Sequence, residues 1–344
     1  MNNLIPLRCI FIFIVFLIIT SCEQKKDQHL QKISNIEKPL NIVVLLAPSG
    51  KGDKSYNDMA IDGINKAKNK YKITVKEVLP VRVDDYPGTI RRFSEDGADL
   101  IIAIGFLYVD AIAATAKNFI NTRFVLIDGK IVNLKNVQSV VFRPQEASFL
   151  AGIAAGLSSK SRKIGFIAGM DIPIMQTFAC GFREGVKYAS KKLGHDIIVT
   201  ERFIGSTPDA FSNPARGRDI ARLMYKTGID VIYHAAGASG NGIIQAAQET
   251  NKYVIGVDTD QSHLAPLHVL TSMRKRIDIA VENAITELSQ NKFSDGLIIM
   301  RLNNGGVDVV RSTLISENIW IEVEKAKKEL LKGSIDLCSQ LNEN

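Results

Sequence analysis

From about residue 40 onward, short apolar runs rich in β-branched residues alternate with amphipathic stretches of helical period. This alternation is typical of βαβ units, and continuous apolar runs are typical of parallel strands that are covered on both faces. A first series of such runs is sufficient for one domain. We expect its strands at Asn41–Leu46, Lys72–Val78, Leu100–Ile104, Phe124–Ile127 and Val137–Phe142.

A second series of the same kind follows, and elements near the end of the chain complete it. Its strands are expected at Lys163–Ala168, Ile197–Phe203, Val231–His234 and Tyr253–Val257. Its helices are expected at Gln145–Ser159, Phe178–Leu193, Asn213–Thr227 and Gly240–Thr250. The late elements are strands at Leu270–Ser272, Gly296–Arg301 and Val307–Val310, and helices at Ile277–Gln290 and from Glu317.

Neither series is complete without these late elements, so we predict that the chain crosses more than once between two doubly wound α/β domains. Crossings near Phe142–Glu146, Ser262–Leu270 and Asn291–Asp295 would form a hinge of several strands, which permits closure around a ligand. The predicted parts are an N-terminal lobe of residues 40–143 plus 270–293, a C-terminal lobe of 144–269 plus 294–335, and a tail of 336–344. Two independent domains on a single linker are the alternative.

The first 22 residues differ from the rest of the chain. Arg8 is the only charged residue before Glu23, and the apolar run Cys9–Ile19 spans about 11 residues. A membrane-spanning helix needs about 20 residues, whereas the central region of a secretory signal has roughly this length. We therefore predict a signal peptide over residues 1–21.

The segment Ile19-Thr20-Ser21-Cys22 resembles the lipobox of bacterial lipoproteins, in which a cysteine is acylated and becomes the mature N-terminus. Cys22 is thus expected to carry lipid, palmitate included, and to anchor the protein to a membrane of the cell envelope, facing the periplasm or the cell exterior. The polar, lysine-rich residues 22–39 would be a flexible tether. An ordinary signal peptide with Cys22 as an incidental thiol is the alternative.

Length and composition agree with two domains. The chain has 344 residues, 46% of them apolar, which is enough to fill two cores. Its formal charge of +7 arises from 43 basic and 36 acidic residues that are interspersed without a basic tract, so nucleic acid is not indicated as a partner. Cys180 and Cys338 lack the spacing of a metal site, and whether they pair is open.

Sequence motifs of catalysis are missing. There is no Gly-x-Ser-x-Gly, and Gly237–Gly242 lacks the spacing of a dinucleotide fingerprint. The histidines without metal-ligand spacing are His195, His234, His263 and His268. A sugar-responsive repressor would need an N-terminal helix-turn-helix, where this chain has its predicted signal and tether. We therefore expect neither an enzyme nor a DNA-binding protein, and neither a cofactor nor a metal.

Glycine, carboxylate and aromatic residues gather directly after the predicted strands. In open α/β sheets, ligands bind beyond the carboxyl ends of the strands, and these residue types suit a nucleoside or a sugar. Any single one of them can equally serve a tight turn or a helix cap. The loops concerned are Pro48–Asn57, Gly105-Phe106, Asp128-Gly129, Gly169–Asp171, Gly205–Phe211, Gly237–Gly240 and Asp258–Gln261.

Five stretches in this order resemble the basic membrane protein family of substrate-binding lipoproteins. They are Gly50–Asn57, Phe142–Gly152, Gly165–Pro173, Gly256–Ser262 and Leu270–Arg276, and the match spans about residues 40–330. The resemblance implies a type I periplasmic-binding-protein fold with three crossings between the lobes. It also implies a monomer that holds a purine nucleoside between two aromatic rings and delivers it to the permease of an ABC importer.

The resemblance further implies roles for individual residues. Tyr56 and Phe211 match the family's aromatic positions and would sandwich the base. The amide of Asn57 would hydrogen-bond the base, and Asp258 would accept hydrogen bonds from the ribose hydroxyls. Lys275 would reach into the cleft and balance a buried carboxylate.

Three more positions are candidates by the same comparison. Gly237 would let the backbone approach the ligand, Asp128 at the end of the fourth strand is a further ligand-binding candidate, and Asp110 belongs either to the site or to a surface helix.

Two positions depart from the family pattern. Ala47 stands where the family often has Asp, and Tyr56 stands where Phe is commoner. A nucleobase or a sugar is therefore an alternative ligand. A surface-displayed antigen or adhesin without a transport role is an alternative function.

Overall fold

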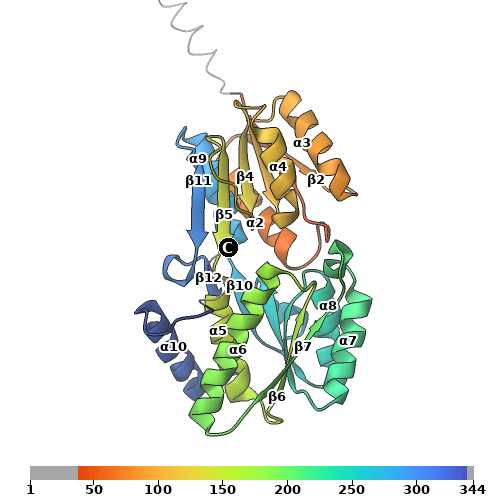
Figure 1. Cartoon of the computed structure of the whole chain (residues 1–344), viewed down its shortest axis with the longest axis vertical. Helices are drawn as coiled ribbons and strands as arrows, with labels where there is room; N and C mark the ends of the chain where they lie inside the picture. Colours follow the sequence, from red (N-terminus) through yellow and green to blue (C-terminus); the bar gives the residue numbers. More distant parts are fainter. Residues whose placement is uncertain (1–37, 339–344) are drawn as a thin grey trace, which may run out of the picture. The chain divides into compact units, whose positions relative to one another are not determined.

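The computed structural model describes residues 38–338 (Figure 1). The predicted signal peptide, Cys22 and tether residues 22–37 lie outside the described residues, as do residues 339–344 of the predicted tail. The described residues from Leu40 onward form one compact unit. Among the described residues, no helix combines the length and apolar character needed to cross a membrane.

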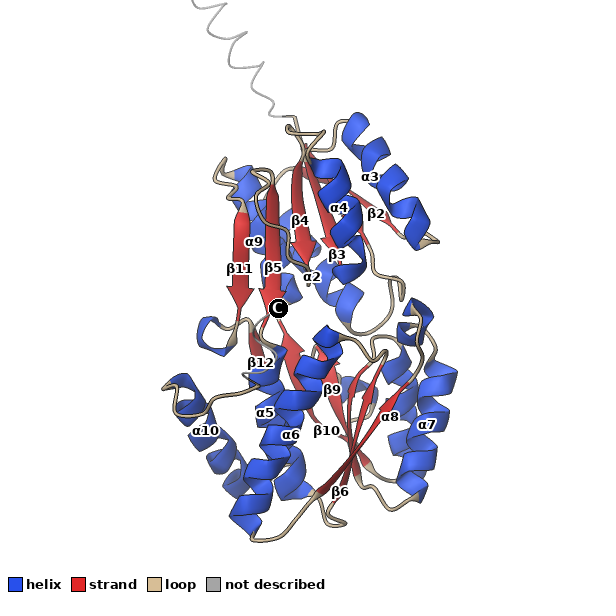
Figure 2. Ribbon diagram, in the orientation of Figure 1, coloured by secondary structure: helices blue, strands red, loops and turns tan. Residues whose placement is uncertain are grey.

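The first of two sheets has six parallel strands in the order β11-β5-β4-β3-β1-β2 (Figure 2). Helices cover both of its faces, with α2 and α9 on one side and α3 and α4 on the other. The strands are β1 (Leu40–Leu45), β2 (Ile73–Val78), β3 (Leu100–Ile104), β4 (Arg123–Ile127), β5 (Val137–Phe142) and β11 (Gly296–Met300). The helices are α2 (Tyr56–Lys68), α3 (Tyr86–Glu95), α4 (Val109–Ala116) and α9 (Ile277–Ser289).

The strands of this sheet are continuous apolar runs because each strand is buried on both sides. Along β1, Ile42 and Val44 belong to the core on the side of α2 and α9, whereas Val43 and Leu45 belong to the core under α3 and α4. All four are at most 1% exposed, and each such side chain contributes about 1.5–3 kcal/mol on burial. The prediction of parallel strands covered on both faces is confirmed.

The second sheet has the order β12-β10-β9-β8-β6-β7, and all its strands are parallel except β12, which runs antiparallel to β10. Helices α5, α6 and α10 cover one face, and α7 and α8 cover the other. The strands are β6 (Lys163–Ala168), β7 (Ile198–Phe203), β8 (Val231–Ala235), β9 (Tyr253–Asp258), β10 (Val269–Lys275) and β12 (Val307–Val309). The helices are α5 (Pro144–Ser158), α6 (Pro173–Leu193), α7 (Pro214–Lys226), α8 (Ser239–Thr250) and α10 (Glu317–Leu331).

Helices α5 and α6 pack at very short range because glycines face the backbone of the other helix. A Cβ atom on Gly185 would lie 2.0 Å from the carbonyl oxygen of Phe149. Helix α6 also begins earlier than predicted, at Pro173 instead of Phe178. Proline is favourable in the first turn of a helix, where its missing N–H has no partner to lose. The extra turn carries side chains that reach the cleft described below.

The chain crosses between the sheets three times, as expected, but two of the crossings lie elsewhere than predicted. The first, between β5 and α5, lies where the sequence placed it. The other two follow β10 and β11. The prediction that residues 270–275 belong to the N-terminal lobe and residues 296–300 to the C-terminal lobe is wrong, because β10 pairs with β9 in the second sheet and β11 pairs with β5 in the first.

The lobes therefore comprise residues 40–143 with 276–300, and 144–275 with the remaining C-terminal elements. The assignment was wrong because the sequence of a short strand does not indicate with which other strand it pairs. Hydrogen bonding to a distant strand decides to which sheet such a strand belongs. Of the two misassigned strands, β11 is a short apolar run, and β10 mixes apolar with polar residues.

The C-terminal segment is fastened to the second lobe. Leu337 is buried in the core, and Cys338 forms a disulfide with Cys180 of α6. The tail that was predicted to start at residue 336 is therefore part of the fold at least as far as Cys338. The disulfide answers the question that cysteine spacing left open, since the partners are 158 residues apart.

Candidate ligand-binding site

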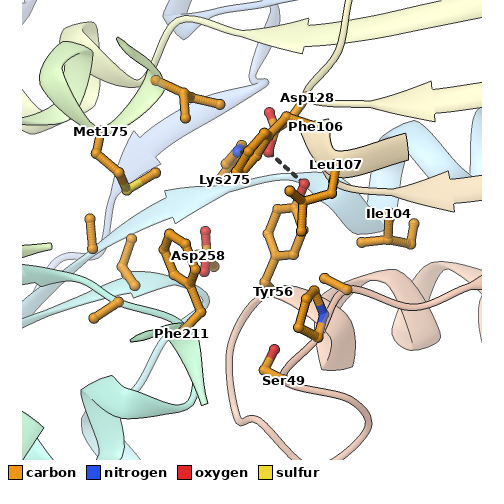
Figure 3. Close-up of a pocket in the computed structure, with 18 of the residues that line it drawn as sticks. Ser49, Tyr56, Ile104, Phe106, Leu107, Asp128, Met175, Phe211, Asp258 and Lys275 are labelled. Atoms are coloured by element: carbon orange, nitrogen blue, oxygen red, sulfur yellow. Dashed lines mark hydrogen bonds and ion pairs between the residues drawn. The ribbon is translucent and has the colours of Figure 1, made fainter. Parts of the chain in front are cut away.

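A cleft lies between the lobes, where the carboxyl ends of strands from both sheets face each other (Figure 3). It contains about 680 Å³ of empty space, counting the part that is open to solvent. Its lining residues from the first lobe are Ala47, Pro48, Ser49, Tyr56, Ile104, Gly105, Phe106, Leu107 and Asp128. Those from the second lobe are Ile174, Met175, Phe178, Phe211, Ala235, Ala236, Gly237, Val257, Asp258 and Lys275.

Six of the seven predicted ligand-binding residues line this cleft. They are Tyr56, Asp128, Phe211, Gly237, Asp258 and Lys275. Every one of them follows or ends a strand or lies in the first turn after a loop, as the rule for open α/β sheets requires. The structure brings these residues, which span more than half of the chain, into one site.

Asn57 is the exception, and its predicted contact with a base is wrong. Its side chain is fully buried and its amide is used inside the loop between β1 and α2. The amide oxygen accepts from the backbone N–H of Ala47 at 2.8 Å, and the amide nitrogen donates to the hydroxyl of Ser49 at 2.8 Å and to Asp53 at 3.0 Å. Asn57 thus shapes the loop that presents Ala47 and Ser49 to the cleft.

Asp110 also lies away from the site. It stands in the first turn of α4, exposed to solvent, and is not among the residues that line the cleft. Of the two interpretations of Asp110, that of a surface helix residue is confirmed.

Two aromatic rings face the cleft from opposite lobes. Tyr56 begins α2, and Phe211 ends a short 3-10 helix after β7; Figure 3 shows their rings on either side of the space near Asp258. A Cβ atom on Gly169 would lie 2.3 Å from the ring of Phe211, so this ring rests directly on a glycine. Gly237, with a φ of 53°, stands close to the backbone of Phe211. Because Gly169 and Gly237 have no side chains, they leave room for Phe211 in this position.

Lys275 and Asp128 form an ion pair between the lobes, deep in the cleft. Their side chains are only 3% and 5% exposed. The hydroxyl of Tyr56 donates to the same carboxylate oxygen, Oδ2 of Asp128, at 2.5 Å. Burial, and then the charge of Asp128, raise the pKa of Tyr56 well above its usual 10.0, so this phenol stays a donor. Oδ1 of Asp128 has no hydrogen-bond partner among the described residues.

Aromatic rings surround the ammonium group of Lys275. Its Nζ lies 5.0 Å from the ring centre of Tyr56, 4.9 Å from that of Phe142 and 5.8 Å from that of Phe178. Cation–π contacts of this kind are attractive, and more so when the cation is removed from water. The charge of Lys275 is thus compensated by Asp128 and by three aromatic rings, so this lysine is already paired.

Asp258 is the second carboxylate of the cleft. It ends β9 and is 5% exposed, and its Oδ2 accepts a hydrogen bond of 2.5 Å from the hydroxyl of Ser55 in the other lobe. Burial raises the pKa of Asp258 from the usual 3.8 to about 6, although Lys275 and Ser55 act in the opposite direction. The group is therefore largely ionised at neutral pH and titrates just below it.

The two carboxylates occupy equivalent positions in the two lobes. Asp128 follows β4 and Asp258 ends β9, and these strands hold the same place in the order of their sheets. Both residues adopt the left-handed backbone conformation, with φ of 62° and 66°. Aspartate visits this region more readily than most residues. Because this geometry is repeated, one carboxylate from each lobe lines the cleft.

Sequence reasoning missed the apolar part of the lining. Ile104, Leu107, Ile174 and Met175 are the most prominent of these residues, whereas Phe106 belongs to the predicted loop Gly105-Phe106 and does line the cleft. Ile174 and Met175 were missed because α6 was predicted to begin at Phe178, after both residues. Pro173, which follows Ile172 just after the loop Gly169–Asp171, was the signal that could have located them.

The donor groups of the cleft suit an organic ligand. Within residues 38–338, no cluster of three or more His, Cys, Asp or Glu side chains could hold a metal ion. The two carboxylates, the phenol and the Ser49 hydroxyl are set among apolar and aromatic side chains. Such a mixture binds a ligand that has flat faces and a few hydroxyl or amide groups.

A model of the family described as ABC transporter substrate-binding protein, PnrA-like (Bmp), matches residues 40–339. The chain belongs to this family. The match covers both lobes and ends just beyond Cys338. It confirms the resemblance to the basic membrane proteins that was noted from five stretches of the sequence. Members are substrate-binding proteins, which agrees with the expectation that the chain is not an enzyme.

Relatives of the family align with most of the chain. Basic membrane protein A of Borreliella afzelii is 36% identical over 300 residues, which cover 85% of this chain and 88% of the relative. The ABC transporter nucleoside-binding protein BmpA of Lactococcus lactis subsp. cremoris is 33% identical over 327 residues, which cover 89% and 91%. An ABC transporter solute-binding protein from Aeropyrum pernix has a similar structure, with a TM-score of 0.81 at 27% identity over 87% of this chain and 93% of that one. The predicted fold class is confirmed.

Proposed function

We propose that this protein captures a purine nucleoside between its two lobes and delivers it to the permease of an ABC importer. The observation that carries the proposal is one cleft in which two aromatic rings, one from each lobe, lie beside a buried, largely ionised carboxylate. A flat base requires the rings, and ribose hydroxyls require the acceptor. The nucleoside-binding relative from Lactococcus lactis supports the same assignment.

In this proposal the base stacks between Tyr56 and Phe211, and Asp258 accepts hydrogen bonds from the ribose hydroxyls. Oδ1 of Asp128 accepts a further hydrogen bond from the ligand, because Lys275 and Tyr56 occupy only Oδ2. With Lys275 already paired, the ionised Asp258 leaves the cleft with a net negative charge. A neutral nucleoside therefore fits better than a phosphorylated nucleotide.

A ligand panel tests this proposal. Thermal unfolding and calorimetry of the purified protein are measured with adenosine, guanosine, inosine, pyrimidine nucleosides, free bases, ribose and amino acids, after partial unfolding to remove any bound ligand. A ligand at 100 times its Kd should add about 2.7 kcal/mol to the free energy of unfolding. We expect purine nucleosides to stabilise the protein and amino acids to have no effect.

The panel also decides between ligands. A response to free bases or ribose alone would overturn the nucleoside assignment while the family assignment stands. It would point to Ala47, which lines the cleft and for which the resemblance implies an Asp in the family, as the position of changed specificity. Display as an antigen without transport is not favoured, because the family description is that of transport receptors.

The proposal extends to attachment at the membrane. We expect residues 1–21 to be removed, Cys22 to carry palmitate, and the monomeric protein to face the periplasm or the cell exterior on residues 22–39. Cells that express the protein and are fed labelled palmitate should yield a labelled product that partitions into detergent. Cys22→Ser should lose the label, whereas Cys9→Ser, within the removed segment, should keep it; labelled Cys22→Ser would refute the anchor.

A further inference from the structure

Three consecutive residues of the first lobe bond directly to the second lobe without lining the cleft. The side-chain amide of Asn241 donates to the carbonyl oxygen of Asp53 at 3.1 Å, and that of Gln261 donates to the carbonyl oxygen of Lys54 at 3.0 Å. Ser55 then donates its hydroxyl to Asp258. None of these residues except Asp258 is part of the cleft lining. The contacts therefore need no ligand.

The segment Asp53–Ser55 is held by hydrogen bonds within its own lobe. The carboxylate of Asp53 is buried and accepts from the backbone N–H groups of Ser55 at 3.0 Å, Asn57 at 2.9 Å and Asp58 at 3.1 Å. The carbonyls of Asp53 and Lys54 precede α2, whose first bond runs from Met59 to Ser55, so the helix does not use them. The carbonyl oxygens of Asp53 and Lys54 are therefore available as hydrogen-bond acceptors for the second lobe.

On the first lobe, these bonds lie away from the crossings. The crossings leave from β5, β10 and β11, which lie toward one edge of their sheets, whereas the segment Asp53–Ser55 follows β1, near the opposite edge of the first sheet (Figure 1). On the second lobe, Asn241 belongs to the first turn of α8, which follows β8, whereas Gln261 follows β9, next to β10, and its backbone N–H donates to Ser272 of β10. Opening of the cleft by rotation about the crossings therefore separates Asn241 from Asp53 more than it separates Gln261 from Lys54.

We propose that Asn241 and Gln261 form a closure latch with the backbone of Asp53 and Lys54. The latch stabilises the closed form and so sets the affinity for ligand and its residence time, although neither side chain touches the ligand. Both are positioning residues. The effect on affinity rests on the proposed function, but the effect on closure does not. A bond that exists only in the closed form shifts the equilibrium between the forms by its whole net free energy.

Asn241→Ala is the cleanest test, because Asn241 is half-buried at the start of a helix that tolerates alanine well. The loss of one net hydrogen bond should raise the dissociation rate of inosine, or of the purine nucleoside that binds best, roughly two- to tenfold. The association rate should stay within about a factor of two. Small-angle X-ray scattering should show a larger radius of gyration for the ligand-free variant than for the ligand-free wild type.

Gln245→Ala is the matched control. Gln245 lies one turn further along the same helix, is exposed, and bonds only to Glu249 among the described residues. It should leave both the dissociation rate and the radius of gyration unchanged. Gln261→Ala should act in the same direction as Asn241→Ala, with an added loss of stability because Gln261 also accepts from the backbone of Val257.

The latch is refuted if Asn241→Ala and Gln245→Ala have the same radius of gyration and the same dissociation rate. If the wild type binds no purine nucleoside, the proposed function fails, but the scattering comparison still decides about the latch. Equal radii of gyration for ligand-free wild type and Asn241→Ala would then overturn it.

Discussion

Replacing Lys275 with methionine should lower the free energy of unfolding by about 3–5 kcal/mol and abolish nucleoside binding, because it leaves the buried carboxylate of Asp128 without a counter-charge. Both side chains are at most 5% exposed, so water cannot take the place of the lysine. Methionine keeps the length and apolar stem of lysine and still packs near Tyr56 and Phe178. Urea denaturation of the ligand-free protein measures the stability, and calorimetry measures the binding.

Arg274→Met is the control for this substitution. Arg274 precedes Lys275 on β10, its side chain is 38% exposed, and its ion pair with Asp308 is long, at 4.0 Å. Surface pairs of this kind contribute about 0–1 kcal/mol. The double variant Lys275→Met with Asp128→Asn should recover much of the lost stability without recovering binding, since no uncompensated charge remains. A Lys275→Met protein as stable as the wild type would show that the pair is not formed in solution.

Asp258→Asn should weaken purine nucleoside binding about 100-fold, because hydrogen bonds to a charged group contribute about 1.5–3 kcal/mol each. Asparagine has nearly the same shape and still accepts from Ser55, so the fold should persist. Asp260→Asn is the matched control, since Asp260 lies two residues further along, exposed and outside the cleft. Equal affinities in the two variants would remove Asp258 from the site.

The same residue predicts a pH dependence. Burial raises the pKa of Asp258 in the folded protein to about 6, above the usual 3.8. Between about pH 4 and 6 the folded protein therefore binds more protons than the unfolded chain, and the contribution of this group to stability falls as the pH rises. Nucleoside affinity should change in the opposite sense and rise about tenfold from pH 5 to pH 7, because hydroxyls donate to the ionised carboxylate. Asp258→Asn should flatten both profiles.

Much of the fold could be predicted from local patterns alone. The strands Leu100–Ile104, Val137–Phe142 and Lys163–Ala168 have the bounds that their apolar runs indicate, because burial on both faces demands such runs. The sheet to which a run belongs could not be predicted in the same way. The strands β10 and β11 were assigned to the wrong lobes, since their partners lie far away in the sequence and pairing depends on backbone hydrogen bonds that every residue type can make.

By itself, the sequence determined the two-lobed α/β class, the rim that carries the site and six of its lining residues, because strand ends and motifs are local features. Only the tertiary structure decided that Asn57 turns inward, that Lys275 pairs with Asp128, and that Cys180 bonds to Cys338. It alone brought Asn241 and Gln261 to the backbone of Asp53 and Lys54. The physical reason is common to the last three: each depends on the relative placement of distant segments that the packing of two sheets and their helices brings together, and no spacing along the chain encodes that placement. Asn57 bonds within its own loop, and there the conformation of the loop decided which way its amide points.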